Sequence, residues 1–268
     1  MAVSIGECFA QLKAHQQKAL IPFLTVGDPD LATTEAALLA LDQAGADLIE
    51  LGIPYSDPLA DGPVIQAAST RALKQGTTLA DVLSLVERLT PKLQAPLILF
   101  SYYNPILSLG VEHFLDKIAQ AGAKGLVVPD LPLEESDLLA HAAQARGIDV
   151  IQLVAPTSPT ERIEKIVKQA RGFVYLVSVT GVTGVRREVS SALQPLINRL
   201  QGLTDLPVCV GFGISSPEQA QQVVDWGADG VIVGSAFVRK LAEATPDKRM
   251  AETTQFCTAL RKAIDSVN

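Results

Sequence analysis

The chain has 268 residues, of which 48% are hydrophobic, and its formal net charge is −7. This composition is typical of a globular protein, and without a basic block neither nucleic acid nor an anionic membrane is an expected partner. No apolar run approaches the roughly 20 residues of a membrane span. The N-terminus has no apolar signal core and the three cysteines are far apart in the sequence, so we expect reduced thiols in a cytoplasmic protein.

Short apolar runs alternate with segments of helical periodicity along the whole chain. Each run is nearly continuously apolar, as expected for a parallel strand that is covered on both faces. The predicted strands span residues 20–25, 47–51, 96–100, 125–129, 149–154, 173–178, 207–211 and 229–234.

The junctions between helices and strands repeat one pattern: a helix end, a glycine, one or two residues and a strand. The pattern predicts glycines in the left-handed conformation just after the helices, at Gly45, Gly122, Gly147, Gly172 and Gly227. At the other ends, "SPTE" (Ser158 to Glu161) and "SPEQ" (Ser216 to Gln219) predict helix starts with capping boxes.

Eight strands with intervening helices predict an α/β protein that folds as a (β/α)₈ TIM barrel. We expect a single domain over residues 1–268, with an extra N-terminal helix and short inserted helices near 64–74 and 235–242. A doubly wound open sheet is the alternative. Its first turn would carry G-x-G-x-x-G, whereas the turn here reads "TVGDPDLAT".

Two acidic residues stand out near the end of the second strand. In "DLIEL", Glu50 lies on the same face as Leu48 and therefore points into the barrel or into the helix layer. A buried carboxylate without a nearby cation is expected to have a raised pKa, which suits a group that exchanges protons; a structural role for Glu50 is the alternative. Asp61 follows in a proline-rich loop, where it is either a turn former or a second functional carboxylate. Asp130 occupies a comparable place after the fourth strand, with a turn or cap role as its alternative.

Three successive strand ends on the C-terminal side of the chain carry glycines. They are "SVTGVTGVRRE", "GFGISSPEQ" and "VGSAFV", the last of which opens a short helix at Ser235. Glycine loops and a helix N-terminus present N–H groups to anions, and many barrels bind phosphate in this place. The sequence therefore predicts a phosphate site without lysine. The three histidines show no ligand spacing, and we expect no metal site.

Taken together, "IPFLTVGDPD", "IELGIPYSDPLADGPVIQ", "YYNPI", "VPDLPLEES", "SVTGVTG", "GFGIS" and "VIVGSA" resemble the alpha subunit of tryptophan synthase over essentially the whole chain. The resemblance implies a lyase that cleaves indole-3-glycerol phosphate to indole and glyceraldehyde 3-phosphate without metal or cofactor. It implies that Glu50 is the general acid and base, and that Asp61 binds the indole N–H and stabilises the cationic ring.

The resemblance also implies a set of substrate contacts. Tyr102 matches a position near the glycerol moiety, and Thr183 a lid residue that contacts Asp61. Phosphate would lie on Gly184, Gly213, Gly234 and Ser235, while the indole ring would be surrounded by Phe23, Ile65, Phe100, Val127, Tyr175 and Phe212.

Members of this family dock a beta subunit that carries pyridoxal phosphate, so the resemblance implies an α2β2 heterotetramer. The matching docking positions are Pro54, Asp57, Pro58, Tyr103 and Asn104. Three alternatives stay open from sequence: another phosphate-binding barrel, a non-catalytic activating subunit and a free-standing indole-releasing lyase.

Overall fold

The computed structural model describes residues 3–178, 193–211 and 213–266, and within them it shows a closed barrel of eight parallel strands in sequential order. The strands are β1 (Ala19–Thr25), β2 (Ile49–Gly52), β3 (Leu97–Phe100), β4 (Gly125–Val127), β5 (Asp149–Val154), β6 (Val174–Val177), β7 (Val208–Gly211) and β8 (Gly230–Val233). All eight overlap the predicted strands, which confirms the expected fold class.

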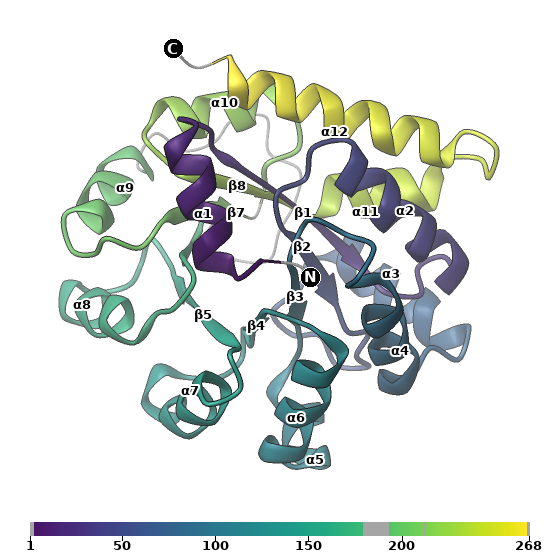
Figure 1. Ribbon diagram of the computed structural model, residues 1–268, viewed down its shortest axis with the longest axis horizontal. Coiled ribbons are helices and arrows are strands. Elements are labelled where there is room, and N and C mark those ends of the chain that lie inside the picture. Colours follow the sequence, from purple (N-terminus) through teal and green to yellow (C-terminus); the bar gives the residue numbers. More distant parts are fainter. Residues whose placement is uncertain (1–2, 179–192, 212, 267–268) are drawn as a thin grey trace.

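Helices surround the strands as an outer ring (Figure 1). They are α2 (Leu31–Gln43), α3 (Pro63–Lys74), α4 (Leu79–Leu89), α5 (Tyr103–Leu109), α6 (Val111–Ala121), α7 (Asp137–Gln144), α8 (Thr160–Gln169), α9 (Leu193–Gln201), α10 (Pro217–Asp225), α11 (Ser235–Glu243) and α12 (Arg249–Asp265), with a short 3₁₀ helix at Leu133–Glu135. The predicted inserted helices correspond to α3 and α11. In the described part of the chain no helix is both long enough and apolar enough to cross a membrane.

The N-terminal helix α1 (Ile5–Ala14) lies across one end of the barrel (Figure 1). Its buried residues belong to the same apolar cluster as the inward-facing strand residues, and the ring of Phe9 lies 5.8 Å from that of Phe173. Because β1 pairs with β8, the barrel joins both ends of the chain. We propose on this ground that residues 1–268 form a single domain.

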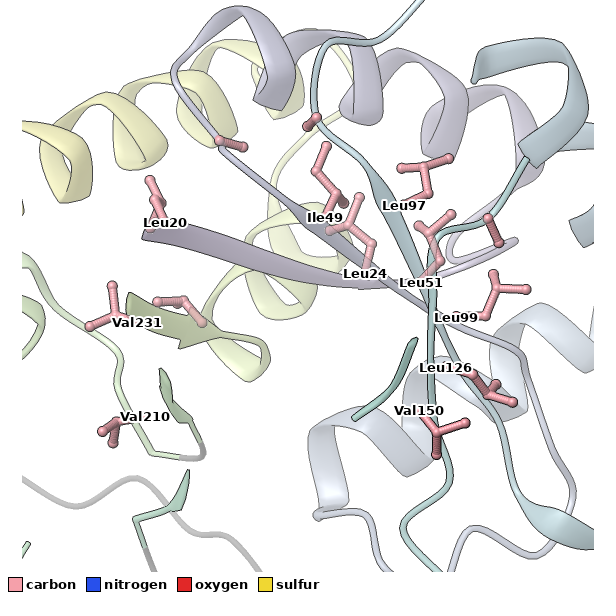
Figure 2. Packing of buried hydrophobic residues seen from close by; sticks show 14 of the residues in the cluster. Leu20, Leu24, Ile49, Leu51, Leu97, Leu99, Leu126, Val150, Val210 and Val231 are labelled. Carbon is pink, nitrogen blue, oxygen red and sulfur yellow. The ribbon is translucent and has the colours of Figure 1, made fainter. Parts of the chain in front are cut away.

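Alternation along each strand separates two apolar layers. One layer fills the space between strands and helices; Figure 2 shows Leu20, Leu24, Ile49 and Leu51 in it. The other layer lines the barrel interior and includes Ile21, Phe23, Leu48, Ile98 and Phe173. The parity of β2 therefore places position 50 on the inside, in register with Phe23 of β1 and Ile98 of β3.

The helix boundaries follow most of the predicted signals, but the two predicted capping boxes do not form as expected. All five predicted junction glycines have positive φ, between 69° and 100°. Ser216 caps α10 as predicted, but the side chain of Gln219 bonds to Ser215 rather than to Ser216. The predicted capping box at Ser158 is wrong, because α8 begins one residue later than expected, with Pro159 as its cap, and the Ser158 hydroxyl accepts from the Ala155 N–H instead.

Candidate active site

Glu50, the second residue of β2, projects into the barrel. Its residue exposure is 1%, and neither carboxyl oxygen has a hydrogen-bond partner within the described part of the chain. A buried and unpaired carboxylate is unfavourable, so burial raises the pKa of Glu50 to about 8. At neutral pH this residue is therefore mainly protonated, as an acid catalyst has to be.

Asp61 reaches the same region from the loop between β2 and α3. Its backbone N–H donates to the Pro58 carbonyl at 3.1 Å and its carbonyl accepts from the Gln66 side chain at 2.9 Å. The residue is 7% exposed. Burial raises the pKa of Asp61 to about 6, and a hydrogen bond from Tyr102 opposes the rise. Asp61 is therefore mainly ionised at neutral pH, in contrast to Glu50.

Glu50 and Asp61 line one pocket. The remaining lining consists of apolar side chains, three glycines and one serine: Phe23, Gly62, Ile65, Phe100, Tyr175, Gly213, Ile232, Gly234 and Ser235. The rings of Phe23 and Phe100 meet edge to face, with centroids 5.6 Å apart. Two acids with different protonation states thus face a space that is lined by apolar side chains, glycine backbone and one serine hydroxyl group.

Two glycines on the inner face allow aromatic side chains to occupy this wall. A Cβ atom on Gly52 would lie 2.6 Å from the ring of Phe23, and one on Gly211 would lie 2.5 Å from the hydroxyl of Tyr175. Real Cβ atoms do not approach other atoms so closely. The strand glycines therefore fix the positions of the two rings that line the pocket.

The start of α11 contributes polar groups to the pocket. Gly234 occupies the cap position and Ser235 is the first residue of this nine-residue helix. The first N–H groups of a helix lack partners within the helix and carry a partial positive charge, which favours an anion. Gly213 joins them from the loop after β7, with φ of +89°.

The structure brings together nine of the residues expected at the site and places others elsewhere. Val127 is fully buried in the barrel interior, and Tyr102 is 4% exposed beside Asp61; neither lines the pocket. Thr183, Gly184 and Phe212 lie outside the described residues. Sequence reasoning missed two lining residues, Gly62 and Ile232, although the inward parity of Ile232 in β8 is a readable signal.

Asp130 has the cap role that was its alternative. Its carboxyl group accepts from the Tyr103 N–H at 2.9 Å, at the first residue of α5, and it does not line the pocket. Among the described residues there is no group of three or more His, Cys, Asp or Glu side chains that could hold a metal ion.

The residues expected at a docking surface differ in exposure. Asp57 and Asn104 are exposed, Pro58 and Tyr103 are partly exposed, and Pro54 is buried. Two large apolar side chains lie beside them in sequence and are open to solvent: Leu59 is 88% exposed and Leu107 is 52% exposed.

Comparison with known proteins agrees with this geometry. The family model described as "Tryptophan synthase alpha chain" matches residues 9–265. A tryptophan synthase alpha chain from Synechocystis is 61% identical over 97% of this chain and 99% of its own length. One from Synechococcus elongatus is 61% identical over 98% of this chain and 97% of its own length.

Solved structures give the same result. A Mycobacterium tuberculosis tryptophan synthase structure matches with a TM-score of 0.90 and 39% identity, covering 98% of this chain and 99% of the other. The alpha subunit from Legionella pneumophila matches with a TM-score of 0.90 and 36% identity, covering 99% of this chain and all of the other, 100%.

Proposed function

This chain belongs to the tryptophan synthase alpha chain family, and we propose that its Glu50 and Asp61 perform the chemistry of that family. The chain is a carbon–carbon lyase that cleaves indole-3-glycerol phosphate to indole and glyceraldehyde 3-phosphate, in tryptophan biosynthesis. The roles that follow for individual residues are our proposal.

One observation supports the assignment above all others: two buried carboxyl groups with different protonation states line one pocket. Burial raises the pKa of Glu50 to about 8 and that of Asp61 to about 6. Near neutral pH one group can give a proton while the other carries a negative charge. Paired acids with separated pKa values are the usual arrangement for acid–base catalysis by carboxyl groups.

The first step is protonation of the ring. The carboxyl group of Glu50 donates its proton to C3 of the indole, which is the carbon that bears the glycerol chain. The ring becomes a cation whose charge is largely at the nitrogen. The carboxylate of Asp61 accepts the ring N–H and stabilises that charge, which matters more inside a buried pocket than in water.

The second step breaks the carbon–carbon bond. Glu50, now a carboxylate, takes the proton from the glycerol hydroxyl next to the ring. The oxygen forms a carbonyl, the bond to C3 breaks, and its electron pair returns to the ring and neutralises it. Indole and an aldehyde result, and Glu50 has regained its proton, so the sequence balances without a cofactor or a water molecule.

The glycine-rich end of the pocket would hold the phosphate of the substrate. Gly213, Gly234 and Ser235 line it, and α11 begins there. Backbone N–H groups and one hydroxyl would bind the anion, in line with phosphate sites at helix N-termini. The apolar wall around Phe23 and Phe100 would then hold the indole ring, with C3 near Glu50 and the nitrogen near Asp61. Among the expected contacts, Thr183, Gly184 and Phe212 lie outside the described residues.

A beta subunit is the expected partner of a chain in this family. We propose an α2β2 heterotetramer in which the beta subunit carries the pyridoxal phosphate. The exposed Asp57 and Asn104, next to the open side chains of Leu59 and Leu107, support a protein-binding surface at this rim. We also place the chain in the cytoplasm, because its three cysteines are free thiols.

An indole-release assay tests the proposed function. The purified chain is given indole-3-glycerol phosphate, alone and with purified beta subunit, and indole is measured directly. We expect release by the chain alone and a faster rate with the partner. No indole under either condition would overturn the proposal, and release without any response to the partner would indicate a free-standing lyase.

A further inference from the structure

A buried ion pair joins the loop after β1 to the helix α3. The side chain of Asp28 is 2% exposed, and Arg71 of α3 donates to both of its oxygens, from Nε at 2.7 Å and from Nη2 at 2.9 Å. Such a two-point contact between a guanidinium group and a carboxylate fixes direction as well as distance. Neither residue lines the pocket, and the proposed chemistry gives neither of them a role.

Asp28 belongs to a loop that is itself well fixed. The Gly27 N–H donates to the Thr34 hydroxyl of α2 at 3.0 Å, and that hydroxyl donates to the Asp30 carbonyl at 3.0 Å. A Cβ atom on Gly27 would lie 2.2 Å from the hydroxyl oxygen of Thr77, so the turn after α3 packs directly against this loop. The loop after β1 therefore gives the second half of α3 a firm support.

The first half of α3 belongs to the pocket. Its cap residue, Gly62, makes no side-chain cap hydrogen bond, and both Gly62 and Ile65 line the pocket. The side chain of Gln66 donates to the Asp61 carbonyl at 2.9 Å, so the backbone of Asp61 is attached to the same helix. A displacement of α3 would therefore move Asp61 and Ile65 with it.

The buried face of α3 consists largely of small side chains. Apart from Ile65, its buried residues are Ala68, Ser69 and Ala72. Small side chains interdigitate little with their neighbours, so packing alone defines the position of this helix along its axis only weakly. Arg71, about 9 Å from Ile65 along the helix axis, supplies a directional contact that this packing lacks.

We propose that Asp28 and Arg71 are positioning residues, which hold α3 so that the Asp61 carboxylate and Ile65 keep their places at the pocket. This inference rests on the role proposed above for Asp61. It gives a buried ion pair outside the pocket a part in the reaction, through the helix rather than through contact with the substrate.

A double substitution separates positioning from stability. Arg71→Met alone would leave the Asp28 carboxylate buried without its cation, which destabilises a protein whatever else the pair does. Asp28→Val combined with Arg71→Met replaces the pair by apolar side chains, and such replacements often restore the lost stability. We expect the urea midpoint to fall in Arg71→Met and to recover largely in the double variant.

Activity should not recover with stability. Misplacement of a catalytic group by about 1 Å lowers a rate by up to about 10²-fold, so we expect kcat for indole release to be about 10-fold to 100-fold lower in both variants. Affinity for inorganic phosphate, measured by calorimetry, should stay within about twofold, because Gly213, Gly234 and Ser235 are not part of α3.

Arg146→Met is the matched control. Arg146 also contacts carboxylates through two of its nitrogens, Asp116 and Glu112 at 2.6 Å each, but both partners lie on α6 rather than beside α3. We expect kcat in Arg146→Met to equal that of the unchanged chain. NMR signals of Asp61 and Ile65 give a second readout, which needs no reaction: they should shift in the double variant and keep their positions in Arg146→Met.

Three results would overturn the inference. Recovery of kcat together with stability in the double variant would make the pair a stabilising contact only. A parallel loss of phosphate affinity would indicate a general loosening of the pocket, and unchanged signals of Asp61 and Ile65 would show that α3 keeps its place without the pair. If the unchanged chain releases no indole, the proposed function fails, but the NMR comparison still decides whether the pair positions α3.

Discussion

Glu50 lies beside Phe23 in the register that joins β2 to β1, and both side chains line the same pocket. On the other side of Glu50, β3 contributes Ile98, which is fully buried. The two neighbouring strands thus bring apolar side chains to the carboxyl group and no hydrogen-bond donor. The protonated state of Glu50 follows from this local arrangement and leads to several testable consequences.

The first prediction concerns catalysis by Glu50. Glu50→Gln keeps the size of the side chain but cannot give or take the proton, so indole release should fall by about 10²-fold to 10⁴-fold. Binding of inorganic phosphate, measured by calorimetry, should stay within about twofold, since the phosphate end of the pocket is unchanged. Indole release near the original rate would contradict the role of Glu50 as acid and base.

The second prediction concerns stability. The folded-state pKa of Glu50 is about 8, above its ordinary value of 4.5, so the folded state binds the extra proton. The contribution of this proton to the free energy of unfolding is fully present below pH 4.5, and it is lost as the pH rises through about 8. Glu50→Gln should therefore resemble the unchanged chain in urea unfolding at about pH 5, and at about pH 9 it should be more stable by a few kcal/mol. Parallel stability curves for the two proteins would contradict the raised pKa.

The third prediction concerns the pH profile of the reaction. Activity requires Asp61 ionised and Glu50 protonated, so kcat/KM should rise through about pH 6 and fall through about pH 8. Asp61→Asn should lower the rate and remove the acidic limb, because its amide does not titrate, while the alkaline limb remains. An acidic limb that persists in Asp61→Asn would assign it to a different group.

The fourth prediction concerns phosphate. Ser235→Ala removes the hydroxyl at the start of α11, and hydrogen bonds to charged groups contribute about 1.5–3 kcal/mol. KM should therefore rise by about 10-fold to 100-fold while kcat changes little. Ser84→Ala is the matched control, since Ser84 is exposed on α4. Equal KM values for Ser235→Ala and the control would remove Ser235 from the phosphate site.

Sequence patterns predicted the features that depend on local periodicity. The inward direction of Glu50 was one of two readings of "DLIEL", and the closed barrel decides between them because position 50 shares a face with Leu48. The junction glycines were predictable because a left-handed residue after a helix strongly favours glycine.

The capping box at Ser158 failed for a local reason, because the Ser158 hydroxyl accepts from the Ala155 N–H three residues earlier. Features that depend on contacts between distant segments were not predictable. Tyr102 matches a substrate position by sequence, yet its hydroxyl meets Ala60, 42 residues earlier in the chain. Such a contact depends on how two loops meet above the barrel, and no periodicity encodes it.

The last prediction concerns closure of the barrel by the C-terminal helix. Arg261 of α12 donates to the Asp47 carboxylate at 2.7 Å and to the Lys18 carbonyl at 2.8 Å, just before β2 and β1. The side chains of Arg261 and Asp47 are only 14% and 19% exposed. Removal of Arg261 would leave Asp47 partly buried without its cation, and burial already raises the pKa of Asp47.

Arg261→Ala should therefore lower the free energy of unfolding by about 2–4 kcal/mol, somewhat less than the loss for a fully buried pair. Arg88→Ala is the matched control, because the pair of Arg88 with Glu35 is more exposed, at 47% and 29%, and should contribute little to stability. Urea unfolding at neutral pH measures both losses. Arg261 contacts residues that precede β1 and β2 and does not line the pocket that contains Glu50 and Asp61. Indole release below the unfolding transition should therefore be unchanged. Equal destabilisation by the two substitutions would show that the contact of α12 with the start of the barrel contributes no more than a surface ion pair.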